Sequence, residues 1–246
     1  MKKLILAMTI ALSVLLTGCM QMDMETVLDK NGGGTYAFTM TMSTEVEGAL
    51  NELAAMDGGM GDEMDDMPDF ANFDKSGFEK KLAKYDVKLK KFGNEIKDGN
   101  RTVHLALEFK SFEGLQASMA ATMGGEDGVT ITKMEDGNYL LEPGDSTISF
   151  DEEEEEPEPE EEPSMEDMQA AMANAGKSME LMGKLMAHSD ELSMTMKITL
   201  PSDVIEHNAP RIEGRTCIWD INAENMMSAE GMEPRIVFSG DGVKIK

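Results

Sequence analysis

Alternation of apolar and polar residues, repeated in several short stretches, constrains the fold of this chain more than any other feature. The stretches are Met20–Met24, Tyr36–Met42, Val103–Phe109, Leu192–Leu200 and Cys217–Ile221. Because successive side chains of a strand point to opposite faces, a period of two is typical of strands with one buried face. The sequence therefore predicts sheet strands that each keep one face in the core and one face in water.

Turn sequences between these stretches predict hairpins. Asn31–Gly34 joins the first two, and Asp98-Gly99-Asn100 joins strands expected over 87–92 and 101–109. Further strands are expected over 129–133, 139–141, 147–150 and 234–238, and helices over 45–56, 73–85 and 111–123. We expect an α+β fold, a largely antiparallel sheet of hairpins with helices packed on one face. We also expect the first and last strands to be neighbours.

The N-terminal residues have the charge and hydropathy pattern of a secretory signal. Lys2 and Lys3 precede an apolar run from Leu4 to Leu16, which at about 13 residues is too short to span a bilayer as a helix. Leu16-Thr17-Gly18-Cys19 resembles the lipobox of bacterial lipoproteins, in which the cysteine is acylated and becomes the mature N-terminus. We therefore expect lipidation of Cys19 and attachment to a membrane of the bacterial cell envelope through that lipid.

The residue after Cys19 bears on which membrane the protein is sent to and on how the protein is oriented at that membrane. Met20 is not aspartate, so nothing here resembles the enterobacterial signal for inner-membrane retention. We expect the outer rather than the inner membrane if the bacterium is Gram-negative. Because strand alternation starts at Met20, the first hairpin should lie close to the headgroups, with the acidic body turned away from the bilayer.

The composition excludes one class of partner and limits the cysteine chemistry. The chain has 22 lysines and arginines against 48 acidic residues, a formal net charge of −26, so nucleic acid would be repelled. Its 25 methionines supply adaptable core volume where aromatic residues make up only 5%. If Cys19 carries lipid, Cys217 has no disulfide partner, and we expect it to be buried as a small apolar residue.

An acidic and proline tract divides the chain. We predict a signal peptide over 1–18, an N-terminal part of the α+β domain over 19–150, an acidic linker over 151–163, and a C-terminal part over 164–246. The C-terminal part, with a long methionine-rich helix and several strands, is expected to complete the same domain. The alternative for residues 151–163 is a segment that attracts calcium weakly or docks a protein.

Methionines recur at three- and four-residue steps after Ser164, which is typical of one face of a helix. This face includes Met168, Met172, Met179, Met182 and Met186. A helix that covers the sheet is the simplest interpretation. The alternative is a surface for an amphiphile or a partner protein, because thioethers repack around irregular shapes.

A methionine- and aspartate-rich loop suggests a second function, metal handling. Four methionines could offer thioethers to Cu(I), and two aspartates could offer oxygens to Ca²⁺. These residues are Met56, Met60, Met64, Met67, Asp62 and Asp65. The mixture favours neither ion, and no cysteine or histidine lies nearby in the sequence.

Signs of catalysis are absent from the sequence. His104, His188 and His207 lack metal-ligand spacing, and no nucleophile or phosphate-binding motif occurs. A hydrolase, the third hypothesis, would need a histidine and a carboxylate brought together by folding. We expect a protein that is not an enzyme and that uses no cofactor.

Two stretches near the ends of the mature chain resemble the LppM-like bacterial lipoproteins. One is Cys19 with the following strand and Asp29–Thr35, and the other is Leu200–Ala209 followed by Gly214–Ile221. Ser202 replaces the usual glycine, and the acidic tract is not part of the pattern. The resemblance implies a mixed α/β, lipid-anchored, non-enzymatic module, with envelope-lipid binding as one possibility, and it carries over no site residues. The leading hypothesis is a non-catalytic envelope lipoprotein that binds a partner protein or an amphiphile.

Overall fold

The computed structural model describes residues 20–54, 73–123, 127–145, 192–222 and 233–245, with the single positions 176, 179 and 183. The strands are β1 (Met20–Leu28), β2 (Gly34–Ser43), β3 (Lys88–Lys97), β4 (Asn100–Phe109), β5 (Asp127–Lys133), β6 (Tyr139–Asp145), β7 (Leu192–Thr199), β8 (Val204–His207), β9 (Arg211–Glu213), β10 (Thr216–Asn222) and β11 (Ile236–Phe238). The helices are α2 (Thr44–Ala54), α4 (Lys75–Ala83) and α5 (Phe112–Met123). No helix within these ranges is long and apolar enough to cross a membrane.

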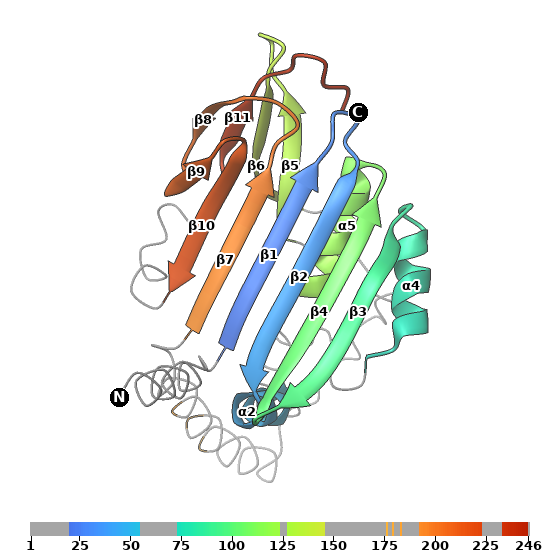
Figure 1. The fold of residues 1–246 in the computed structure, drawn as a ribbon, viewed down its shortest axis with the longest axis vertical. Helices are drawn as coiled ribbons and strands as arrows, with labels where there is room; N and C mark the ends of the chain where they lie inside the picture. Colours follow the sequence, from blue (N-terminus) through green and yellow to red (C-terminus); the bar gives the residue numbers. More distant parts are fainter. Residues whose placement is uncertain are drawn as a thin grey trace, which may run out of the picture.

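A seven-stranded sheet with the order β3-β4-β2-β1-β7-β10-β9 forms the larger layer (Figure 1). The two hairpins expected from the turn sequences are confirmed, because β1 pairs with β2 and β3 pairs with β4, both antiparallel. Gly32 and Gly99 have positive φ angles of 87° and 81° in the turns between them. These φ angles are the backbone conformation for which glycine is favoured.

The first strand has a different neighbour from the one predicted. β1 lies between β2 and β7 and pairs with β7 in parallel, whereas the last described strand, β11, belongs to another sheet. The prediction that the first and last strands are neighbours was therefore wrong. β7 alternates like β1 and buries the same face, whereas all three residues of β11 are buried and need cover on both sides.

A second sheet, with the order β5-β6-β11-β8, was not anticipated (Figure 1). All its neighbours are antiparallel. β8 and the edge strand β9 of the larger sheet were not predicted. Both strands are short and largely exposed, so their sequences show no alternation of buried and exposed residues. The fold is thus mixed α/β and dominated by antiparallel strands, but it holds two sheets instead of one.

The three described helices lie at different places on the larger sheet (Figure 1). α5 contacts β2, β4 and β5, and the Ser111 hydroxyl accepts a hydrogen bond from the Gly114 backbone N–H at 3.2 Å, as expected for an N-cap. α4 lies beside the edge strand β3 and contacts α5. α2 is tied to the sheet by Arg101 of β4, whose Nε donates to Glu47 at 2.6 Å.

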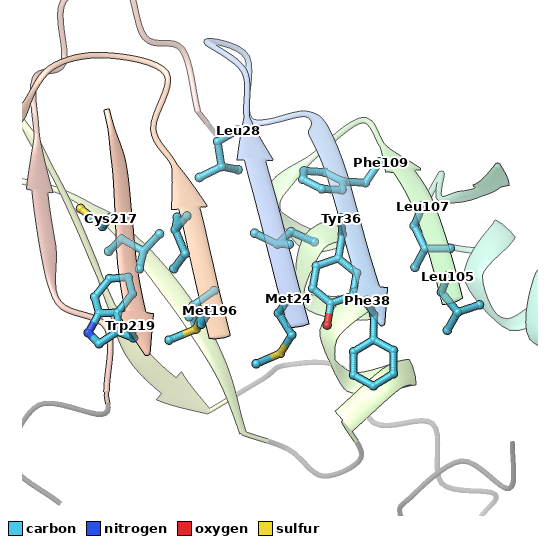
Figure 2. Packing of buried hydrophobic residues seen from close by; sticks show 14 of the residues in the cluster. Met24, Leu28, Tyr36, Phe38, Leu105, Leu107, Phe109, Met196, Cys217 and Trp219 are labelled. Atoms are coloured by element: carbon cyan, nitrogen blue, oxygen red, sulfur yellow. The ribbon is translucent and has the colours of Figure 1, made fainter. Parts of the chain in front are cut away.

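The inward residues of the larger sheet form the core that the alternation predicted (Figure 2). Fully buried members include Tyr36, Phe38, Leu105, Leu107 and Trp219. The intervening residues, such as Asp23 and Glu25, are exposed. Cys217 is buried in this core, as expected, so the period of two identified the buried face correctly.

A candidate ligand cavity between the two sheets

A small apolar cavity lies where the larger sheet, α5 and the second sheet meet. Its lining comes from β1, β2 and β7 on one side and from α5, β5 and β6 on the other: Met24, Thr26, Tyr36, Leu115, Met119, Val129, Leu141, Met196 and Ile198. Its free volume is about 10 Å³, close to the minimum that a single water molecule needs. In this conformation the cavity is closed to any larger ligand.

Three methionines make the lining of the cavity unusually adaptable. Met24 and Met196 are inward residues that lie opposite each other in the β1–β7 pair, and Met119 reaches the cavity from α5. A methionine side chain is unbranched and has three rotatable bonds, so it can change shape with little cost. The lining therefore has more conformational freedom than one built from branched side chains.

The Tyr36 hydroxyl at the cavity is neutral and hydrogen-bonded. The Tyr36 hydroxyl lies 2.9 Å from Thr122 Oγ1, which donates to the Ser118 carbonyl at 3.0 Å. Burial raises the pKa of Tyr36 well above its ordinary value, and the bond to Thr122 offsets only part of that effect. The phenol is thus uncharged at physiological pH. A lining of this kind suits an apolar ligand, and it contains no carboxylate, histidine or cysteine.

Most residues singled out in the sequence lie outside the described ranges. These are Cys19, the loop residues Met56, Met60, Asp62, Met64, Asp65 and Met67, and the helix residues Met168, Met172, Met182 and Met186. Met179 is described; it is helical and 78% exposed, so at this position the side chain is not part of the core. Among the described residues no group of three or more histidine, cysteine or acidic side chains could hold a metal ion. Metal binding by the loop stays a prediction.

The two described histidines lie apart from each other and from the cavity. His104 is on the outward face of β4, where its Nδ1 lies 2.9 Å from Thr39 Oγ1. His207 is exposed on β8 in the second sheet. His188 lies outside the described residues. The geometry of His104 and His207 gives no support to the hydrolase hypothesis.

The cavity itself was not anticipated from the sequence. Met24 and Met196 were expected to face the core, but Leu115, Val129 and Leu141 come from elements whose placement against the sheet has no local signal. Alternation shows which side chains point inward. It does not show where two layers fail to fill the space between them.

A distant structural neighbour is found among solved structures, whereas the sequence comparisons give no match. No protein-family model matches the chain, and no curated protein matches it by sequence. Among solved structures, the folded domain of LppM from Mycobacterium tuberculosis, determined by NMR, aligns with 90% of this chain and 88% of its own. The two share 10% sequence identity, with a TM-score of 0.40.

Proposed function

We propose that this protein is a lipid-anchored, non-catalytic module of the bacterial cell envelope that binds an amphiphile between its two sheets. The observation that carries the proposal is the apolar cavity lined by Met24, Met119 and Met196. The lipobox-like Leu16–Cys19 supports the anchor. The leading hypothesis from the sequence also named a partner protein as the ligand. The described residues show no comparable site for a partner protein.

The energetics favour an apolar chain as the bound part of the ligand. Each CH₂ group buried contributes about 0.8 kcal/mol, so a chain of several carbons can offset the repacking of a few methionines. The lining is almost entirely apolar and holds no charged side chain that could act as a countercharge. A charged headgroup would therefore remain in water, outside the cavity.

Purification of the chain without its lipid anchor, followed by mass spectrometry of co-extracted lipids, tests amphiphile binding. A fatty acid probe is then titrated against the emission of Trp219, the only tryptophan, which pairs with Met196 across β10 and β7. We expect a saturable change in emission. An empty protein with no response to the probe would count against the proposal.

Two matched double variants separate the cavity from methionine content in general. M24I/M196I replaces two cavity methionines by stiff β-branched residues, whereas M40I/M42I makes the same change at buried β2 positions that do not line the cavity. We expect fatty acid affinity to fall roughly tenfold, about 1.4 kcal/mol, in the first variant only. Equal losses in both variants would indicate a general effect on folding.

The anchor is tested separately in cells. Incorporation of labelled palmitate into the wild-type chain, and its loss in C19A, would support lipidation at Cys19. Release of C19A into the soluble envelope fraction should accompany that loss. Equal labelling of C19A would place the lipid elsewhere.

A further inference from the structure

A basic surface stands out on this acidic protein. The segment Lys75–Lys110 holds ten of the 22 lysines and arginines but only five of the 48 acidic residues, so its formal net charge is +5 while that of the whole chain is −26. Such a concentration of one sign is not expected from a random distribution of charge. A local field of this kind attracts an anionic partner.

Five exposed lysines at the α4–β3 edge of the larger sheet form this surface, which we call the basic edge. Lys80, Lys81 and Lys84 belong to α4 and its C-cap, and Lys88 and Lys91 belong to β3. α4 contacts β3, so the two elements that carry these lysines lie side by side (Figure 1).

Described carboxylates near the basic edge offset little of its charge. Glu108 has its pKa lowered chiefly by Lys90 and to a smaller extent by Lys88, its partner across β3 and β4. Within the described ranges, ion pairs form next to the basic edge between Lys90 and Glu108 at 2.8 Å and between Lys110 and Asp86 at 3.6 Å. None of the five lysines of the basic edge takes part in an ion pair with a described residue. No described carboxylate therefore competes at ion-pair distance with a partner for these five lysines.

The strand register argues against a bilayer as that partner. Lys88 pairs with Glu108, Glu108 with Thr35, and Thr35 with Val27, so Lys88 lies level with Val27. Val27 is seven residues along β1 from Met20, a distance of about 24 Å at 3.4 Å per residue. If Cys19 anchors the protein as proposed, this exceeds the screening length of about 8 Å several times over.

The chain carries a segment of opposite charge and suitable length. Residues 151–163 hold ten carboxylates and no basic residue. The segment begins six residues after Asp145, where β6 ends, and α5 contacts both α4 and β5, the partner of β6. The route crosses the length of α5, which has 12 residues and is about 18 Å long, and two packing distances of about 10 Å each. The six connecting residues span at most about 20 Å and the segment itself up to about 40 Å more, so the basic edge lies within reach.

We propose that the basic edge binds residues 151–163 of the same molecule. Tethering gives the segment an effective local concentration of the order of millimolar. A separate polyanion lacks that advantage and has to approach a body of strong negative charge. The competing explanation is that lysines on β3 only discourage pairing with other sheet edges. That explanation requires no contact with the acidic segment.

Zero-length carbodiimide cross-linking of the full chain tests the contact, because it joins a lysine only to a carboxylate that touches it. We expect peptides in which Lys80, Lys81, Lys84, Lys88 or Lys91 is joined to residues 151–162. These products should disappear in 1 M salt, where the screening length is about 3 Å. The Lys90–Glu108 pair provides an internal positive control.

Mixing equal amounts of unlabelled and ¹⁵N-labelled chain distinguishes contacts within a molecule from contacts between copies. Products that contain only one label support the proposal. Products of mixed label would show that the basic edge binds a second copy, which overturns it. Cross-links that are absent, or that are spread evenly over Lys133, Lys197 and Lys244, would also overturn it.

Two triple variants of equal charge provide the matched comparison. K81Q/K84Q/K91Q removes three lysines of the basic edge, whereas K133Q/K197Q/K244Q removes three lysines elsewhere. We expect the yield of cross-links from residues 151–162 to the remaining lysines Lys80 and Lys88 to fall about fivefold in the first variant, from the loss of charge–charge contacts. The second should match the wild type, and circular dichroism checks that both variants fold.

Discussion

Met24 of β1 lies directly opposite Met196 of β7, in the parallel strand pair that joins the two parts of the chain. Both side chains are buried, and both line the cavity between the sheets. The strand pair that joins the N-terminal and C-terminal parts of the larger sheet is therefore also part of the proposed binding site. Ligand uptake and the packing of the two parts should be linked.

Truncation of Met196 should destabilise the fold by creating a larger cavity. We expect Met196→Ala to lower the free energy of unfolding by about 2–5 kcal/mol, and Met196→Leu by less than about 1.5 kcal/mol. Urea denaturation measures both. Met179→Ala, at a position that is 78% exposed, should change stability by no more than about 0.5 kcal/mol. Equal effects at Met196 and Met179 would contradict the burial of Met196.

Removal of the indole nitrogen of Trp219 should cost little. The side chain is 1% exposed, and its Nε1 has no hydrogen-bond partner among the residues that the structure describes. An unsatisfied buried donor costs about 1–3 kcal/mol, so its loss in Trp219→Phe offsets part of the lost packing. Trp219→Ala has no such compensation and should cost about 3–5 kcal/mol. If both variants lose the same stability in urea denaturation, Nε1 has a partner in solution.

The Cys217 thiol should make stability fall at high pH. Burial raises its pKa from an ordinary value of 9.0 to about 11. Between these values the unfolded chain releases the thiol proton while the folded chain keeps it, so stability decreases as pH rises through this window. Below the window the thiol contributes no pH dependence. The difference between the wild type and Cys217→Ala in urea denaturation at a series of pH values isolates the effect, and a flat difference would refute it.

Two glycine-to-alanine substitutions should change the stability of the protein in opposite directions. Gly34 has a φ of 157°, and a Cβ there would overlap the carbonyl oxygen of Val27, so Gly34→Ala should destabilise the β1–β2 hairpin by about 3 kcal/mol or more. Gly48 lies in α2 with open space around it. Gly48→Ala should stabilise the protein by about 0.5–1 kcal/mol, because alanine loses less conformational freedom in a helix. Thermal unfolding compares the pair, and a shared sign would show that one local environment is misassigned.

Local patterns were sufficient to predict most elements of the fold. The alternation at Tyr36–Met42 and Val103–Phe109, and the glycine turns beside them, identified two hairpins and their buried faces. A shift of one residue in the register would turn every side chain of a strand to the opposite face, so alternation specifies the register strongly wherever a strand is half-buried. β8 and β9 were missed because short exposed strands carry no such contrast.

The candidate site could not be predicted in the same way. Met24 and Met119 are far apart in the sequence, and each pattern showed only that its own residue faces inward. Their approach depends on α5 and the second sheet packing over β1 and β7. The basic segment is visible in the sequence, but only the strand register shows how far it lies from Met20.

The amino-acid sequence by itself determined the strands, the hairpins, the buried face of the larger sheet and the signal that points to a lipid at Cys19. These follow from local periodicity, turn residues and a short N-terminal motif. Only the tertiary structure decided that β1 neighbours β7, that a second sheet exists, and that Met24, Met119 and Met196 share a cavity. Such pairings are chosen by competition among many apolar faces of similar chemistry, and that choice depends on the packing of the whole chain.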